Sequence, residues 1–330
     1  MKAGRPIGTI IVGAGYFGQK RLDACKSLQK EYRVVGVVDT DKKVLQHISK
    51  KYHVPVSASL SLFTNKADLA IIATPNAYHT KQCIDALSLG LHVLCEKPLA
   101  TNYRDALRIV AASKRYRRFV KTGSNHRFIP YVEKAIELVK KGAVGKVLSI
   151  NGAIGNNGAH VAGRWFWNPK LSGGGTLLDN GCHLVDIVRL LLGGITRCSA
   201  HTATLYWKKA RTEDTGSAIF VTKDGRQAVI SSSWTRWDGY LSLEVFGDKG
   251  CVITDSATEN VVVINKNGTV TAKYNYSKDK TSSYQKELLY MKACIERGVA
   301  PKPDAKDGAR VIQLIEAAYQ SSRKKTWITL

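Results

Sequence analysis

The first 123 residues alternate short apolar runs with amphipathic segments. The apolar, β-branched runs predict short strands, at 9–12, 34–38, near 56, at 68–73, 93–95 and 119–122. The segments between them carry apolar residues at helical spacing and predict helices, one following residue 18 and others at 41–51, 78–89 and 102–116. Repeated strand–helix units of this kind imply a parallel, doubly wound sheet that binds ligands at the carboxyl ends of its strands.

After residue 123 the pattern changes. Alternating or apolar runs separated by Gly, Asn and Asp turns predict an antiparallel sheet, with strands at 218–222, 228–234, 241–246 and 261–264. Other segments predict helices at 131–141, 177–192, 284–297 and 305–322, and strands at 147–153 and 326–330. The pattern therefore predicts an α/β fold with two domains, residues 1–123 with the parallel sheet and residues 124–330 with the antiparallel one.

A glycine-rich turn joins the first predicted strand to the first predicted helix. Its glycines are Gly13, Gly15 and Gly18, and the acidic residue Asp39 follows 21 residues later, at the end of the second strand. In a dinucleotide-binding domain the first glycine makes the tight turn, the second lets the backbone approach the pyrophosphate, and the third lets the helix pack on the strand. An acid at the spacing of Asp39 contacts the adenosine ribose. Residues 1–123 are therefore predicted to form a doubly wound, dinucleotide-binding domain.

Two of the predicted strands end in polar residues. Thr74-Pro75-Asn76 follows one, and Glu96-Lys97-Pro98 follows another. In a dinucleotide-binding fold these ends border the crevice where the nicotinamide lies. A lysine after a buried strand is commonly just exposed, but the position of Lys97 favours a functional role.

The helix predicted after Gly173-Gly174-Gly175 carries Asp179 and His183 four residues apart, on one helical face. A carboxylate beside an imidazole suits a general base that works near neutral pH. A structural explanation is equally open, because Thr176 and Asp179 also fit a capping box and His183 fits a hydrogen-bonded histidine on a partly apolar helix. Asp186, on the same face, is expected either to bond the imidazole or to serve as a structural partner.

Other polar and aromatic residues gather before the triple glycine and after the strand at 119–122. They are Asn125, His126, Arg127, Asn156, Asn157, His160, Arg164, Trp165 and Trp167. Aromatic platforms with amide and guanidinium donors suit polyol ligands, but they also suit ordinary domain interfaces. For Tyr284 and the segment 234–237, a core or interface position is the favoured interpretation.

The chain is strongly basic, and the distribution of the charge matters more than its size. Its 330 residues carry a formal net charge of +24, and residues 1–120 hold 20 basic and 8 acidic side chains, half of that excess. With no basic arm and no nucleic-acid-binding motif, we expect no nucleic-acid partner. A basic cleft would instead steer an anionic substrate, with an association rate that falls as salt rises.

Cysteine spacing and hydropathy indicate the cellular compartment in which the protein is expected. The seven cysteines are scattered and never form a CxxC pair, which favours a reducing compartment and no structural metal site. The apolar stretches are far shorter than a membrane span requires. We therefore expect a cytoplasmic protein with no membrane partner.

Taken together, the motifs GAGYFG (13–18), ATPN (73–76), EKP (96–98), GSNHRF (123–128) and SGGGTLLDNGCH (172–183) resemble those of the Gfo/Idh/MocA oxidoreductases. The resemblance runs over essentially the whole chain. It implies a Rossmann domain followed by an α/β domain with a large, mostly antiparallel open sheet, a cis peptide bond before Pro98, and oligomer contacts through the open sheet face. A homodimer or homotetramer is expected.

The resemblance also implies a ternary site between the domains. Its catalytic set would be Lys97, Asp179 and His183. Cofactor contacts would come from Gly13, Gly15, Tyr16, Phe17, Gly18, Asp39, Thr74, Pro75, Asn76, His79, Glu96, Lys97 and Asn125. Substrate contacts would come from Lys97, Arg127, Asn157, Arg164, Trp165, Asp179 and His183, without a metal.

The expected activity is hydride transfer between a secondary alcohol of a sugar, cyclitol or amino sugar, nucleotide sugars included, and a nicotinamide cofactor. Asp39 predicts NAD over NADP, because its carboxylate repels the 2′-phosphate. Against this, Lys42 or Lys43, which follow closely in the sequence, could reach a 2′-phosphate and favour NADP. Three alternatives stay open: a keto-sugar reductase, an NAD-using glycosidase of the same family, and a sensor of NAD or sugar without turnover.

Overall fold

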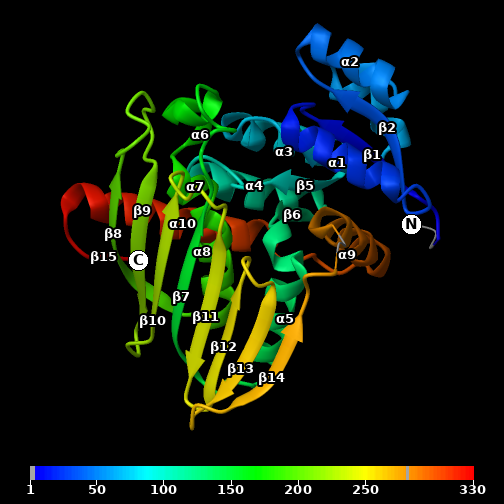
Figure 1. Ribbon diagram of the computed structural model, residues 1–330. Coiled ribbons are helices and arrows are strands. Elements are labelled where there is room, and N and C mark those ends of the chain that lie inside the picture. The colour runs from blue at the N-terminus through cyan, green and yellow to red at the C-terminus, as the bar shows by residue number, and fades with distance from the viewer. Residues whose placement is uncertain (1–3, 280–281) are drawn as a thin grey trace. The chain divides into compact units, whose positions relative to one another are not determined.

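The computed structural model describes residues 4–279 and 282–330, which divide into two compact units (Figure 1). Unit 1 comprises the described residues of Met1–Asn125 together with Ser282–Ala309. Unit 2 comprises the described residues of His126–Thr281 together with Arg310–Leu330. The sequence predicted a single boundary at 123/124, whereas the chain returns to unit 1 after residue 281.

Unit 1 is built on a six-stranded parallel sheet of order β3-β2-β1-β4-β5-β6. Its strands are β1 (Ile7–Val12), β2 (Tyr32–Val38), β3 (Val56–Ser57), β4 (Leu69–Ile72), β5 (His92–Glu96) and β6 (Val120–Gly123). Its helices are α1 (Tyr16–Ser27), α2 (Lys42–Tyr52), α3 (His79–Ser88), α4 (Tyr103–Tyr116) and α9 (Ser283–Arg297), with 3-10 turns η1 (Leu60–Lys66) and η2 (Asn76–Tyr78). The strand order reverses between β1 and β4, and a doubly wound sheet binds its ligand at such a switch point. The predicted parallel, doubly wound sheet is confirmed.

Local sequence explains where these helices begin. Asp41 caps α2 by accepting a hydrogen bond from the backbone N–H of Lys43 at 2.8 Å, and Asn102 caps α4 through Asp105 N–H at 2.9 Å. The strands β1 and β4 are buried throughout, as expected for a sheet covered on both faces.

The late helix α9 completes the core of unit 1. Leu288, Met291 and Ile295 belong to the same apolar cluster as residues of β1, β2 and β4. The Tyr32 hydroxyl donates a hydrogen bond to the Leu288 carbonyl at 2.5 Å. These contacts give the physical reason for the return of the chain: the apolar face of α9 is buried against the first unit.

Unit 2 contains a nine-stranded sheet of order β14-β13-β12-β11-β7-β10-β9-β8-β15, antiparallel except where β7 pairs with β10. Its strands are β7 (Val147–Gly155), β8 (Ile195–Ala203), β9 (Thr215–Thr222), β10 (Gln227–Ser233), β11 (Leu241–Gly247), β12 (Gly250–Asp255), β13 (Asn260–Asn265), β14 (Val270–Asn275) and β15 (Ile328–Thr329). Its helices include α5 (Pro130–Lys140), α6 (Pro169–Ser172), α7 (Thr176–Asp179) and α8 (Gly181–Leu192), while α10 (Ala305–Lys324) spans the division between the units, and two 3-10 turns are η3 (Asn125–Phe128) and η4 (Trp165–Trp167). The mostly antiparallel sheet is confirmed.

One face of this sheet is covered by α5 and α8. Along β10, Ala228, Ile230 and Ser232 are buried while the residues between them are more exposed, which is the period-two pattern of a half-buried strand. The strands β8, β12 and β14 were not predicted. The outermost of these, β14, has no buried residue and so lacks a hydrophobic signal.

The burial of α9 predicts a contrast between two adjacent leucines. Leu288 is fully buried, whereas Leu289 is 43% exposed. We expect Leu288→Ala to lower the free energy of unfolding by about 2–5 kcal/mol, because it leaves a cavity in the core. Leu289→Ala, the matched control, should change it by less than about 0.5 kcal/mol. Urea denaturation followed by circular dichroism measures both, and equal effects would show that α9 does not belong to this core.

Candidate active site

The glycine turn of unit 1 is shaped by close backbone contacts. Gly13 has φ +91°, and a Cβ there would lie 2.8 Å from the Ala73 carbonyl. A Cβ on Gly18 would lie 1.8 Å from the Gly13 oxygen, whereas one on Gly15 would meet no atom within 4 Å. The turn is therefore crowded on the protein side and open at Gly15, which fits the approach of a pyrophosphate to the backbone.

Asp39 is tied to this turn. One carboxylate oxygen accepts a hydrogen bond from Ala14 N–H at 2.7 Å and the other accepts from Asp41 N–H at 3.0 Å. The side chain therefore stands fixed at the carboxyl end of β2, where an adenosine ribose binds in this fold.

A cavity of about 530 Å³ opens beside the ends of β1 and β2. Its lining residues are Val12, Val38, Ala58, Ser59, Leu60, Ser61, Tyr78, Lys81, Gln82, Asp85, Ser88 and Leu89. The volume is that of a small-molecule site. Sequence analysis did not identify these residues as a group, because they come from four segments whose contact no local pattern signals.

The ends of β4 and β5 are joined by His79. The ring is fully buried, with Nδ1 2.9 Å from the Pro98 carbonyl oxygen and Nε2 2.9 Å from that of Thr74. Burial lowers the pKa of His79, against the effect of the two carbonyl oxygens. The predicted contact of His79 with the cofactor stays a prediction. The ring lies between the two strand ends that carry Thr74 and Pro98, and in its neutral form it donates to one of the two carbonyl oxygens.

Lys97 follows β5, and the Lys97–Pro98 peptide bond is cis. The side chain is half-buried, and its Nζ lies 5.7 Å from the centre of the Phe17 ring. Lys97 is thus brought to the glycine turn. Its neighbour Glu96 is buried and accepts a hydrogen bond from Arg21 Nε at 2.6 Å, while Asn76 and Asn125 are also buried.

In unit 2, the predicted helix 177–192 is broken. The segment α7 ends at Asp179 and α8 begins at Gly181, and His183 N–H donates to the Asn180 carbonyl at 3.1 Å. Asn180, the one residue between the two segments, keeps right-handed helical dihedral angles of φ −89° and ψ −46°. The side chains of Asp179 and His183 are both buried.

The capping box proposed for Thr176 and Asp179 is wrong. Thr176 is the first residue of α7, not its N-cap, and its hydroxyl lies 2.8 Å from that of Ser232. The start of the helix is held by Glu213, whose carboxylate accepts from Gly175 N–H at 2.8 Å and from Leu177 N–H at 3.0 Å.

Glu213 also explains the glycines before α7. A Cβ on Gly175 would lie 2.0 Å from the Glu213 carbonyl oxygen, and one on Gly174 would lie 2.2 Å from the Tyr319 hydroxyl. That hydroxyl donates to Glu213 at 2.7 Å. Burial raises the pKa of Glu213, although Tyr319 and the backbone donors oppose the shift.

Two residues that contact the predicted catalytic residues were not assigned to the site from the sequence. The indole Nε1–H of Trp234, a fully buried side chain, donates to Asp179 at 3.3 Å. The His126 ring stacks on that of His183 with centroids 3.6 Å apart and planes 7° from parallel. His126 was only a weak polar candidate and Trp234 a core candidate, and no local spacing signals either contact.

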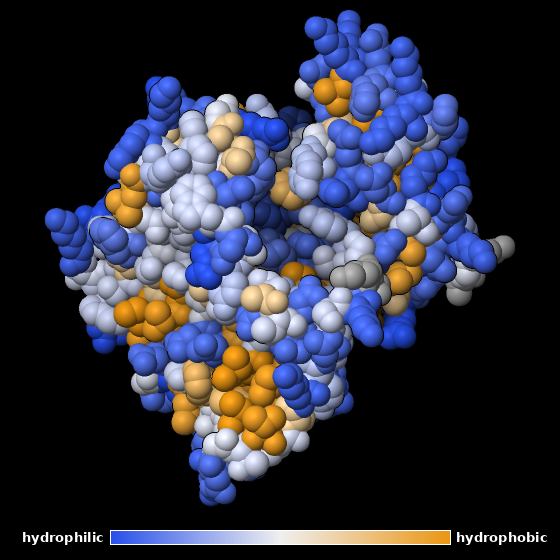
Figure 2. All heavy atoms as spheres, viewed as in Figure 1, coloured by the Kyte–Doolittle hydropathy of each residue, from blue (hydrophilic) through white to orange (hydrophobic). Residues whose placement is uncertain are grey.

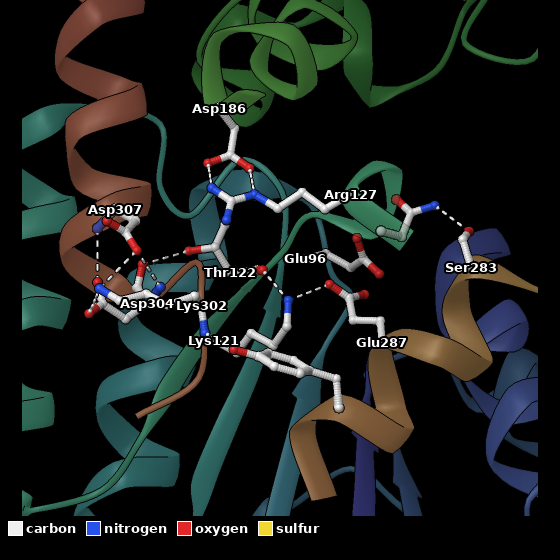
Figure 3. A network of polar contacts seen from close by, with 12 residues as sticks. Glu96, Lys121, Thr122, Arg127, Asp186, Ser283, Glu287, Lys302, Asp304 and Asp307 are labelled. Atoms are coloured by element: carbon white, nitrogen blue, oxygen red, sulfur yellow. Dashed lines mark hydrogen bonds and ion pairs between the residues drawn. The ribbon is translucent and has the colours of Figure 1, made fainter. Parts of the chain in front are cut away.

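Arg127 lies in η3, and its side chain contacts α8. Its Nε and Nη2 each donate to an Asp186 oxygen at 2.6 Å, a bidentate pair seen in Figure 3. Of the two roles considered for Asp186, this geometry favours the structural partner.

The remaining predicted substrate residues lie in the loop after β7. Asn157 is exposed and its side chain accepts from Ala159 N–H at 3.1 Å, and Arg164 is exposed. Trp165 is half-buried and stacks on Phe166 with centroids 3.8 Å apart. These contacts stay within the loop.

Among residues 4–279 and 282–330, no helix combines the length and apolarity that a membrane span requires. Within these same residues, no three His, Cys, Asp or Glu side chains gather where they could hold a metal ion.

The burial of His79 predicts that the free energy of unfolding depends on pH, and His92 offers a matched control. The unfolded chain takes up a proton near pH 6.5, whereas the folded His79 resists it, so stability present above about pH 6.5 is lost as the pH falls toward the lowered folded pKa. His92, whose pKa is lowered to about 4 mainly by burial, contributes in the same sense.

We expect His79→Asn and His92→Asn each to flatten the acid loss of unfolding free energy in urea titrations over a series of pH values. Only His79→Asn should also weaken NADH binding, because only His79 joins the Thr74 and Pro98 segments. Equal NADH affinity in the two variants would contradict this role.

Known proteins resemble the chain in both units. A family model described as "Oxidoreductase family, NAD-binding Rossmann fold" matches residues 7–124, and one described as "GFO/IDH/MocA C-terminal domain" matches residues 132–253. Inositol 2-dehydrogenase of Rhizobium meliloti is 26% identical over 97% of this chain and 98% of its own. The putative UDP-kanosamine synthase oxidoreductase subunit of Amycolatopsis mediterranei is 29% identical over 68% of this chain and 67% of its own.

Among solved structures, that of aldose-aldose oxidoreductase from Caulobacter crescentus, complexed with glycerol, superposes with a TM-score of 0.88 at 25% identity, covering 99% of this chain and 100% of the other. The two matched models lie end to end in the order of the motifs recognised in the sequence. The chain therefore belongs to the Gfo/Idh/MocA family of oxidoreductases, with an NAD(P)-binding Rossmann fold in unit 1.

Proposed function

We propose that the protein is a dehydrogenase that oxidises a secondary alcohol of a sugar, cyclitol or amino sugar, nucleotide sugars included, with NAD as the cofactor. The observation that carries the proposal is the capping of α7 by Glu213. Because Glu213 performs the structural role once considered for Asp179, a chemical role is favoured for the buried Asp179, which lies four residues before His183 in the sequence. The inositol and sugar dehydrogenases among the relatives support the substrate class.

In the proposed mechanism, His183 accepts the hydroxyl proton of the substrate on an imidazole nitrogen. The Lys97 ammonium stabilises the negative charge that develops on the same oxygen. Asp179, held by Trp234, orients the alcohol or the imidazole. The nicotinamide, when bound, supplies the hydride acceptor.

In unit 1, Gly13, Gly15 and Gly18 would cradle the pyrophosphate, with Asp39 at the adenosine ribose. The cofactor contacts would be completed by Tyr16, Phe17, Thr74, Pro75, Asn76, His79, Glu96, Lys97 and Asn125. For Arg127, the ion pair with Asp186 supports a role in holding η3 against α8. Asn157, Arg164 and Trp165 remain the proposed substrate contacts from the loop.

A homo-oligomer is proposed as well. On the sheet face opposite α5 and α8, Ile219 and Val229 pair across β9 and β10, and Ile253 lies on the same face of β12. Val229 is 40% exposed, and Figure 2 shows apolar residues gathered over the strands of this sheet. A second copy of the chain would cover this face in a homodimer or homotetramer, and light scattering would measure the mass of that assembly. The cytoplasmic location stays a prediction.

The activity is tested by incubating the enzyme and NAD with cyclitols, free sugars, amino sugars and nucleotide sugars, and following absorbance of the reduced cofactor. With the best substrate, we expect Lys97→Met and His183→Asn each to lower kcat by roughly 10²–10⁴-fold, the range for a lost acid–base or electrostatic group. His201→Asn, a change at an exposed histidine of β8, is the control and should leave kcat unchanged.

Near-normal turnover of both variants would overturn the mechanism. Stoichiometric NADH release separates dehydrogenation from keto-sugar reduction and from glycoside cleavage. NADH binding without turnover on any class would instead identify a sensor.

Cofactor choice is predicted by Asp39. Asp39→Asn keeps an acceptor for Ala14 N–H but removes the charge that repels a 2′-phosphate, so the ratio of kcat/KM for NADP to that for NAD should rise by about tenfold or more. Asp41→Asn, which removes an equal charge at the α2 cap, is the control and should leave the ratio near its original value. Tighter binding of NADP than of NAD by the unmodified protein would contradict the prediction.

A further inference from the structure

A cluster of four charged side chains is buried beneath the ends of β5 and β6 in unit 1. Arg21 of α1 donates from Nε to Glu96 Oε1 at 2.6 Å and pairs through Nη2 with Glu287 Oε2 at 2.6 Å. Glu287 of α9 also pairs with Lys121 Nζ of β6 at 2.6 Å, a contact drawn in Figure 3. Lys121 in turn donates to the Thr122 carbonyl at 3.1 Å.

This cluster is closed to solvent and balanced in charge. The side chains of Arg21, Lys121 and Glu287 are 0% exposed and that of Glu96 is 7% exposed. Burial acts to raise the pKa of Glu287, but the charges of Lys121 and Arg21 outweigh it and lower the pKa. Each charge is therefore compensated only while every partner keeps its place.

Gly123, the last residue of β6, packs closely against both Arg21 and Glu96. A Cβ on Gly123 would lie 3.1 Å from Arg21 Nη2 and 3.1 Å from the Glu96 Cα. With Oε1 engaged by the guanidinium, the Glu96 carboxylate is restrained in rotation and in position. This is the residue that precedes Lys97.

The first turn of α9 supports two of the proposed cofactor residues at once. The Ser283 hydroxyl accepts a hydrogen bond from Asn125 Nδ2 at 3.0 Å. The Arg21 guanidinium carbon lies 4.6 Å from the centre of the Tyr284 ring. Burial, together with the charge of Glu96, raises the pKa of Tyr284 to about 12. One helical turn, more than 150 residues distant in sequence, thus bears on both Asn125 and, through Arg21, Glu96.

We propose that Arg21 and Ser283 are positioning residues for the nicotinamide ribose: Arg21 orients the Glu96 carboxylate and Ser283 orients the Asn125 amide. A carboxylate accepts hydrogen bonds from ribose hydroxyls and an amide both donates and accepts, so fixing the two groups fixes the ribose that carries the reacting ring. The inference rests on the proposed function only in assigning Glu96 and Asn125 to the cofactor. A purely structural cluster would dock α9 on α1 without affecting that half of the dinucleotide.

The test compares NADH with ADP, which shares the adenosine half but lacks the nicotinamide ribose. Affinities for both are measured by calorimetry on the unmodified protein, Arg21→Lys and Ser283→Ala. Arg21→Lys keeps the charge but loses the planar fork that reaches both carboxylates. We expect each variant to weaken NADH by about tenfold, the equivalent of one hydrogen bond to a charged or fixed partner, and to leave ADP affinity unchanged.

The control is Lys292→Met, which breaks the ion pairs of another α9 side chain with Glu31 and Glu296 without touching Glu96. It should leave both affinities unchanged, whatever it does to the unfolding transition. Ser283→Ala removes one half-buried hydroxyl and so decides the matter if Arg21→Lys fails to fold.

Unchanged NADH affinity in folded variants, or equal losses for NADH and ADP, would overturn the inference while leaving the dehydrogenase proposal standing. Failure of the unmodified protein to bind NADH would instead overturn the proposed function. The two failures are therefore distinguishable.

Discussion

The pairing of Arg21 with Glu96 and Glu287 imposes the strictest constraint on unit 1. Taking a charge out of water costs several kcal/mol, and removing one partner of a buried pair typically costs about 3–5 kcal/mol because the other charge is left uncompensated. The cluster as a whole adds little net stability, since an apolar replacement of similar volume is often as good. Its effect is on geometry: a shift of α9 by one turn would take the Glu287 carboxylate away from both Arg21 and Lys121. The late segment is thereby locked to the strand that presents Glu96 and Lys97.

Unit 2 uses a single carboxylate in a comparable way. Glu213 holds the start of α7 from the segment before β9, and Tyr319 of α10 holds Glu213. Their close approach leaves no room for side chains at Gly174 and Gly175, which is why the motif before α7 is glycine-rich. In each unit, residues distant in sequence set the position of the proposed catalytic groups. The motifs name the groups, and long-range polar contacts hold them in place.

Local patterns were sufficient for the parallel sheet, the glycine turn and the place of Asp39, because each depends on residues close together in the sequence. They were insufficient where the signal is an interaction across the chain. Nothing in the sequence around residue 287 indicates that its carboxylate neutralises Arg21 and Lys121, so the return of α9 to unit 1 was not predicted. The break at Asn180 was missed for a similar reason, since a single changed hydrogen bond leaves the apolar pattern of the helix intact.

The large positive charge acts on a different length scale from these contacts. Arg21 and Lys121 are matched by carboxylates in the interior, whereas Lys42 and Lys43, among the many basic side chains behind the net charge of +24, are exposed to solvent. Such charges are screened beyond about 8 Å at physiological ionic strength, and they raise the local concentration of any anion, including both dinucleotides. Asp39 acts at contact distance, where two unit charges about 4 Å apart interact by about 4 kcal/mol at an effective dielectric constant near 20. In the proposed function, the surface charge would therefore affect the rate of encounter, and the discrimination between NAD and NADP would depend on the single carboxylate that is bonded to the glycine turn.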